Sequence, residues 1–226
     1  MVLDAGRGSS PLSRRALSTL CEPYWFPLYA YLRRRGSDAH EAEDHTQAFF
    51  TRLLEKQDVR LADPARGKFR SFLLTSLNHF LANERDHRRA QKRGGGQALL
   101  SLDFEHGENQ YGLEPADELT PEKLFDRSWA LTVLDQTMAR LQEESAGADQ
   151  QNVFDRLKVY LTEKKGAVGY REVGGELGMT EGAVKVAVHR LRGRYRELLR
   201  EEIGRTVATE DEVEEEMRDL LAALAG

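Results

Sequence analysis

The sequence predicts an all-α protein, in which two helical domains are joined by a flexible acidic linker. Apolar residues recur at helical spacing through most of the 226-residue chain. Capping residues and glycines bound the segments that carry this spacing. Residues 97–121 contain Gly and Pro, lack strong periodicity and separate two sets of helical segments. We therefore expect a first domain over 11–96, a linker over 97–121, a second domain over 122–204 and an acidic C-terminal tail over 205–226.

The first domain is expected to contain four helices. Helices over 11–21 and 23–35 come first, and Gly36 ends the second of them. Asp38 caps the third helix, with Glu41 three residues later as its capping-box partner. The buried face of this third helix is predicted to consist of Ala42, Phe49, Phe50, Leu53 and Leu54.

A long fourth helix is expected to present an aromatic and basic surface. It follows a loop over 57–68, runs from Phe69 to about Arg93 and stops at Gly94. Aromatic side chains beside basic ones suit stacking against unpaired bases as well as contacts with phosphates. Core packing explains most of the phenylalanines equally well, and basic residues at a helix end also complement the helix dipole. Five basic residues among the nine from Arg85 to Arg93 exceed what the dipole needs.

The segment from Tyr170 to Leu199 has the pattern of a helix-turn-helix. A short helix is followed by a tight turn at Gly178 and by a longer helix that Thr180 caps. In this motif, residues near the N-terminus of the second helix reach base edges in the major groove of DNA. The apolar stripe that packs the second helix on the first consists of Val184, Val188, Leu191, Tyr195 and Leu198.

The opposite face of the second helix carries small and basic residues, which allow close approach to DNA and contact with phosphates. The alternative is an amphipathic hairpin with a solvated basic face, which the turn chemistry and the excess of Arg over acid disfavour. The residues on this face and its flanks are Gly182, Lys185, Val186, His189, Arg190, Arg192, Gly193 and Arg196.

Charge is sorted along the chain. The chain is 40% hydrophobic and 31% charged, and its net charge of −5 would by itself argue against nucleic acid. Residues 60–96, however, carry nine Lys and Arg against three acids, and residues 97–126 carry eight acids against one Lys. The tail carries many acids, and its apolar residues recur at helical spacing from 210 to 224. The sequence is compatible with two states of the tail: one docked on a basic surface and one exposed to solvent.

Several function classes are excluded on composition. The single cysteine, Cys21, rules out an internal disulfide and a Cys-rich zinc site. No apolar run approaches the roughly 20 residues that span a bilayer, and the N-terminus lacks the apolar core of a signal peptide. We therefore expect a soluble, cytoplasmic protein with no membrane association.

No catalytic motif is present either. His40 and His45 are five residues apart and fall on different helix faces, and no zinc-protease, Walker or serine-hydrolase motif occurs. The glycines at 94–96 follow a helix, whereas a phosphate-binding loop would follow a strand. We predict no enzyme activity, no catalytic residues, no cofactor and no metal.

Two segments together resemble one known family. The run from Asp38 to Leu54, followed by Gly67 to Leu74 and an Arg-rich helix end, resembles region 2 of the extracytoplasmic-function (ECF) sigma factors of bacterial RNA polymerase. The helix-turn-helix resembles region 4 of the same family. The resemblance covers roughly residues 12–203, with both regions in the family's order.

This resemblance implies two binding partners, core polymerase and promoter DNA, and the residues that would contact each of them. Core polymerase would be met by the third helix, at Asp44, Gln47 and Thr51. The minus ten promoter element would be opened and held, with capture of a flipped base, by the fourth helix and the loop before it. The contacts implied there are Lys68, Arg70, Asn78, Asn83, Arg85, Arg88 and Arg89. Those implied for the duplex minus thirty-five element are Thr180, Glu181, Gly182, Lys185, Val186, His189, Arg190 and Arg192.

Two functions from different classes follow. The first is an ECF-type sigma factor that binds core polymerase, recognises promoter DNA and initiates transcription, with an anti-sigma factor as a further partner that the family allows. The second is a helix-turn-helix regulator that acts without polymerase, its first domain binding an effector or dimerising. The third helix, joined to an aromatic and basic helix, favours the sigma factor, because a repressor needs neither.

Overall fold

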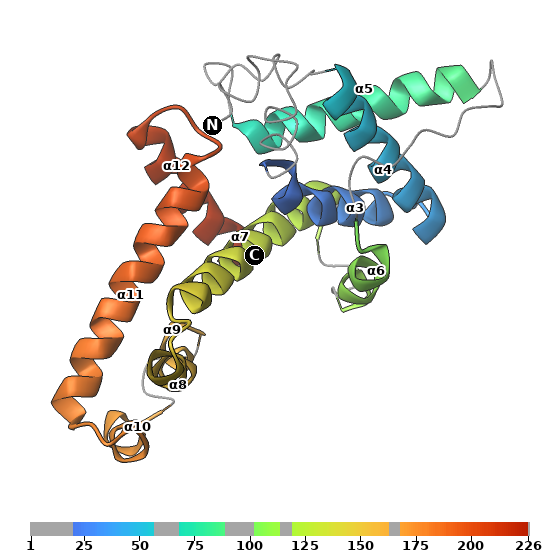
Figure 1. Cartoon of the computed structure of the whole chain (residues 1–226). Coiled ribbons are helices and arrows are strands. Elements are labelled where there is room, and N and C mark those ends of the chain that lie inside the picture. Colours follow the sequence, from blue (N-terminus) through green and yellow to red (C-terminus); the bar gives the residue numbers. More distant parts are fainter. Residues whose placement is uncertain (1–19, 57–67, 89–101, 114–118, 163–167, 226) are drawn as a thin grey trace. The chain divides into compact units, whose positions relative to one another are not determined.

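The structure of the chain is a computed structural model in which all regular secondary structure of the described residues is helical (Figure 1). This confirms the predicted all-α class. None of the described helices is long and apolar enough to cross a membrane. The residues that the structure describes are 20–56, 68–88, 102–113, 119–162 and 168–225. Nearly all of the predicted helix over 11–21, the loop over 57–68 and the fourth helix beyond Arg88 lie outside them.

The described residues form two compact units. The first unit comprises the residues up to Thr132 and those from Ile203 onward, and the second comprises Val133–Glu202. Both divisions fall inside helices, namely α7 (Pro121–Glu144) and α11 (Glu181–Gly204). The compact units therefore differ in their bounds from the domains expected from the sequence, and the first unit contains both an early and a final segment of the chain.

Helix α3 (Trp25–Arg34) forms the centre of the first unit. A short 3-10 helix (Glu22–Tyr24) precedes α3, and every residue from Phe26 to Leu32 is buried. Gly36, with a φ of 96°, ends α3 in a backbone conformation that favours glycine. Helix α3 contacts both α4 (Ala39–Lys56) and α6 (Phe104–Gly112).

Helices α4 and α5 (Phe69–Arg88) correspond to the third and fourth helices predicted for the first domain. The backbone N–H of Glu41 donates to Oδ1 of Asp38 at 2.8 Å, so α4 begins at the predicted cap. The rings of Phe49 and Phe80 meet edge to face across the two helices, with centroids 5.9 Å apart. The predicted buried side chains of α4 are all buried, and the apolar side chains buried on α5 are Phe69, Leu73, Leu77 and Phe80.

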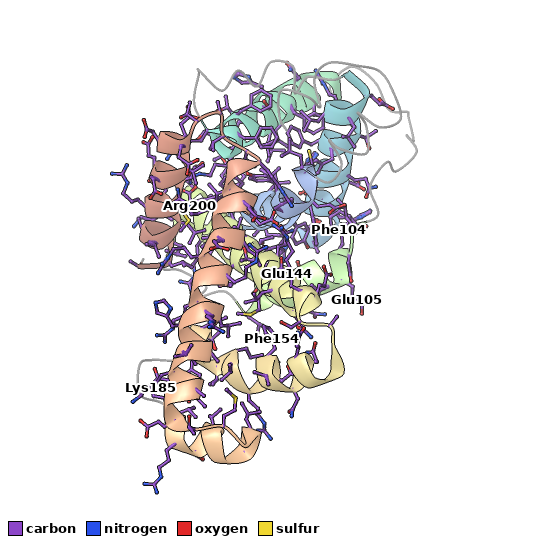
Figure 2. All side chains as sticks on the ribbon, turned by 60° about the vertical axis from the view of Figure 1, so that its left-hand side comes forward. Phe104, Glu105, Glu144, Phe154, Lys185 and Arg200 are labelled. Carbon is purple, nitrogen blue, oxygen red and sulfur yellow. The ribbon has the colours of Figure 1, made fainter. Side chains whose placement is uncertain are left out.

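Helix α6 departs from the expectation of an extended linker over 97–121. Asp103 caps it by accepting a backbone N–H from three residues later at 2.9 Å. Phe104 at its start (Figure 2) packs against the rings of Trp25 and Tyr29, with centroid separations of 5.6 and 5.7 Å. Part of the expected linker is therefore a helix bound to α3.

The second unit contains the rest of α7 and four further helices: α8 (Ala148–Leu157), α9 (Val159–Thr162), α10 (Tyr170–Leu177) and most of α11. The stacked rings of Tyr160 and Tyr170, 4.9 Å apart, join α9 to α10. One buried cluster consists of Leu157, Tyr160, Val173, Val184 and Val188, and a second of Leu141, Phe154 and Leu198.

Helices α10 and α11 are joined by the tight turn that the sequence predicts. Gly178 has a φ of 65°, which is the left-handed conformation that glycine adopts readily. The N–H of Met179 donates to the carbonyl of Gly174 at 2.8 Å and closes the turn. The hydroxyl of Thr180 accepts the N–H of Ala183 at 3.2 Å, so the predicted cap of α11 is present.

The acidic tail contains helix α12 (Glu210–Ala225). Val213, Glu216 and Leu220 of this helix are buried within the first unit. Of the two states left open by the sequence, the structure therefore has the docked one.

Candidate nucleic-acid interface

The outer face of α11 carries the residues expected to read duplex DNA. Packing of Val184 and Val188 into the core of the second unit fixes which face of the helix points outward. A β-carbon at Gly182 would meet no atom within 4 Å, so the helix has room for close approach there. The residues of this face that lie exposed are Thr180, Glu181, Gly182, Lys185, Val186, His189, Arg190 and Arg192.

Lys185 is exposed on this face and is paired with a neighbouring carboxylate. Its ammonium lies 2.7 Å from Oε1 of Glu181, one helical turn earlier, and 5.6 Å from the centroid of the Tyr170 ring. The hydrogen bond between the two side chains raises the pKa of Lys185 and lowers that of Glu181. Figure 2 shows Lys185 in the N-terminal half of α11. Because the pair is solvent-exposed, a phosphate can replace the carboxylate at small cost.

Arg192 has a structural task that the sequence pattern did not indicate. Its Nη2 and Nε donate to the backbone carbonyl of Tyr160 at 2.8 and 3.3 Å. This anchors the end of α9 to α11. Arg192 therefore joins α11 to α9, a structural role distinct from the DNA contact expected of it.

The α4 face expected to meet polymerase lies on one side of that helix. Asp44 is exposed, and Gln47 and Thr51 are half-buried. Their spacing of three and four residues places all three on one helix face. Asp44 contributes a negative charge to that face.

A cavity of about 160 Å³ lies between α4 and α5. Its walls combine aromatic rings with hydrogen-bonding groups, a combination that suits a flat, unstacked base. Asn83 is the predicted DNA contact that lines it, and Arg52, whose guanidinium lies 5.8 Å from the Phe80 ring centroid, was not predicted. The lining residues are Phe49, Arg52, Leu53, Phe72, Ser76, His79, Phe80 and Asn83.

Asn78 lies apart from this cavity. Its side-chain carbonyl accepts hydrogen bonds from Tyr31 at 3.1 Å and from Arg35, and its amide donates to the carbonyl of Leu74 at 3.0 Å. Asn78 therefore links α5 to α3. The side chains of Arg85, Arg88 and Arg89 lie outside the described part of the structure.

Arg70 is buried in an ion network. Its side chain is 8% exposed, and its guanidinium contacts Glu216 at 3.0 Å and Asp126 and Asp219 at 2.5 Å. The guanidinium carbon also lies 4.5 Å from the centroid of the Trp129 ring. Burial disfavours the charged form, but the charge of Glu216 and its hydrogen bond outweigh this and raise the pKa of Arg70.

Lys68 is held by the same acidic helix. Its ammonium pairs with Asp219 and lies 3.6 Å from Glu216 and 3.9 Å from Glu215. Lys68 and Arg70, both expected to contact the minus ten element, are therefore occupied by carboxylates of α12 in this structure.

The comparison with known families concerns the part of the chain that contains α3, α4 and α5. Residues 24–94 match the family model for sigma-70 region 2. No curated protein and no solved structure matches the chain significantly. The match indicates that this part of the chain is a sigma-70 region 2 domain.

Proposed function

We propose that this chain, a sigma-70 family member by its residues 24–94, is an ECF-type sigma factor that binds core RNA polymerase and directs it to promoters. The observation that carries the proposal is the region 2 match on a helical unit, followed along the chain by a capped helix-turn-helix in a separate unit. A regulator that only binds duplex DNA needs the second of these and has no use for the first.

The second unit would hold the minus thirty-five element. Lys185 and His189 supply charge and hydrogen bonding, and Val186, which is 52% exposed, supplies an apolar surface for a thymine methyl group. Burying Val184 and Val188 on the opposite side sets this orientation. The residue types therefore suit a major-groove contact.

The first unit would capture an unpaired base of the minus ten element in the cavity between α4 and α5. Phe72 and Phe80 offer ring faces and edges, and His79 and Asn83 offer hydrogen-bonding groups. Strand opening costs unstacking energy, which stacking and hydrogen bonding in an aromatic pocket can offset. The neighbouring α4 face with Asp44 would hold core polymerase at the same time.

The test is transcription in vitro with purified bacterial core polymerase and a library of promoter fragments. We expect the added chain to bind core polymerase and to start transcripts at defined positions. A chain that binds duplex DNA but neither binds core polymerase nor starts specific transcripts would instead be an ordinary helix-turn-helix regulator. The variant Phe72→Ala tests the cavity separately. It removes part of the cavity wall and should reduce open-complex formation while leaving polymerase binding unchanged.

A further inference from the structure

Helix α12 belongs to the first unit although it follows the helix-turn-helix in sequence. Val213 and Leu220 anchor it in the apolar core, and they are 6% and 1% exposed. Glu216, on the same side of the helix, is 2% exposed. An acidic side chain is rarely buried unless it is paired. The burial of Glu216 therefore indicates a specific attachment of α12.

The partners of this attachment are two basic residues at the start of α5. Glu216 and Asp219, three residues apart on one face of α12, both pair with Arg70 and with Lys68. Glu215 adds a third carboxylate near Lys68. Charged groups in hydrogen-bond contact interact more strongly than neutral ones, and Arg offers a fork that fits carboxylates and phosphates alike.

The chemistry that binds α12 is also the chemistry that binds a nucleic acid backbone. Phosphates require Lys and Arg donors, and Lys68 and Arg70 cannot pair fully with phosphates while three carboxylates surround them. Occupancy by α12 and occupancy by phosphate are therefore mutually exclusive at these residues.

We infer that α12 is a removable cover that competes with nucleic acid for Lys68 and Arg70. The inference rests on the proposed function, because it concerns control of the same first unit. Only molecules in which the helix has left can bind nucleic acid through these residues. The apparent affinity is therefore the intrinsic affinity multiplied by the fraction of such molecules.

The test uses the full chain with Asp219→Asn, which removes one carboxylate that contacts both basic residues. Its matched control is Asp211→Asn, which removes the same charge from an exposed position of α12 with no ion pair among the described residues. The probe is a short, labelled single-stranded DNA, because the helix-turn-helix is suited to duplex. Fluorescence anisotropy gives the Kd, and thermal unfolding shows that both variants fold.

We expect Asp219→Asn to bind the single strand about three- to tenfold more tightly, and Asp211→Asn to stay within about twofold of the wild type. Adding Lys68→Ala to Asp219→Asn should remove most of the gain, because the freed ammonium makes the new contact. Equal affinities of the wild type and Asp219→Asn, or a gain that persists without Lys68, would overturn the inference.

Hydrogen exchange supplies a second measurement on the unaltered protein. With saturating single-stranded DNA, the amides of residues 210–225 should exchange at least severalfold faster than in the free protein, because α12 has left. If these amides stay equally protected at full DNA occupancy, α12 remains docked while DNA is bound, and the inference is wrong. Failure of the proposed function is distinguishable from this result, since it appears as absent promoter-specific transcription for the wild type and every variant.

Discussion

Gly174 and Met179 approach each other so closely that a β-carbon at position 174 would lie 2.6 Å from the carbonyl oxygen of Met179. That oxygen belongs to the backbone of the turn between α10 and α11, which cannot move away without disturbing the turn. The methyl group of an alanine would also lie 3.5 Å from Val184, a buried residue of α11. Glycine at 174 therefore fixes how α11 is presented.

Gly174→Ala is accordingly expected to destabilise the second unit by about 1–3 kcal/mol, because overpacking displaces backbone. The matched control is Gly175→Ala in the same helix, where a β-carbon would meet no atom within 4 Å. That change should be neutral or stabilise by up to about 1 kcal/mol, since alanine favours the helix. Urea unfolding followed by circular dichroism measures both. Equal effects at the two glycines would contradict the packing argument.

The turn could be predicted from the sequence because its signals are local. Gly178 permits the left-handed conformation that ends α10, and Thr180 caps α11, which begins at the next residue. The two residues together therefore specify where α10 ends and α11 begins. The apolar stripe led by Val184 and Val188 then sets the buried face. The turn residues and the apolar spacing within α11 are therefore enough to predict both the turn and the buried face of the helix.

The network at Arg70 could not be predicted, because its partners are distant in sequence. Glu216 and Asp126 lie far from Arg70 along the chain, and acidic residues at helical spacing look the same whether they are solvated or paired. Helix α6 was missed for a different reason. Gly107 and Gly112 weaken its helical pattern, and its burial depends on an aromatic surface of α3 that only the fold creates.

Gly107 provides a test of α6. A β-carbon there would lie 2.9 Å from the Trp25 ring, so Gly107→Ala should push α6 away from α3. We expect a loss of about 1–3 kcal/mol in the first unit and a change in tryptophan fluorescence, because Trp25 gains solvent. Gly112→Ala, in the same helix with no atom within 4 Å, is the control and should leave the emission unchanged. A shifted emission in both variants would place the effect elsewhere.

Lys185 is expected to contact phosphate after leaving Glu181. Lys185→Ala should weaken binding to duplex DNA and reduce the slope of log K against log salt by about 0.9. Lys158→Ala is the control, since Lys158 belongs to the same unit and is likewise exposed and paired with a nearby acid, Asp155, at 2.8 Å. Binding measured over a series of salt concentrations separates the two. If the slope is the same in both variants, Lys185 does not touch DNA.

Asp44 is expected to contact core polymerase. Asp44→Ala should weaken binding of the full chain to core polymerase by about tenfold, the loss typical of one important interface contact. Glu43→Ala removes a charge that is also exposed from the preceding position of α4, about 100° around the helix, and should have little effect. Duplex DNA binding should be unchanged in both variants. Equal losses for the two acids would mean that charge alone, rather than the predicted face, matters.

Acid should weaken the attachment of α12 in a way that depends on Asp219. Burial alone would raise the pKa of this carboxyl, but the hydrogen bond from Lys68 and the charges of Lys68 and Arg70 hold it below its usual value. A lowered pKa in the folded state contributes stability above the unfolded value of about 3.9, and that contribution is lost as the pH falls through the lower, folded value. The difference in unfolding free energy between the wild type and Asp219→Asn should therefore be constant from pH 7 to about pH 5 and shrink below about pH 4. Urea unfolding at each pH measures this difference, and a difference that persisted at pH 3 would show that the carboxylate charge is not what attaches the helix.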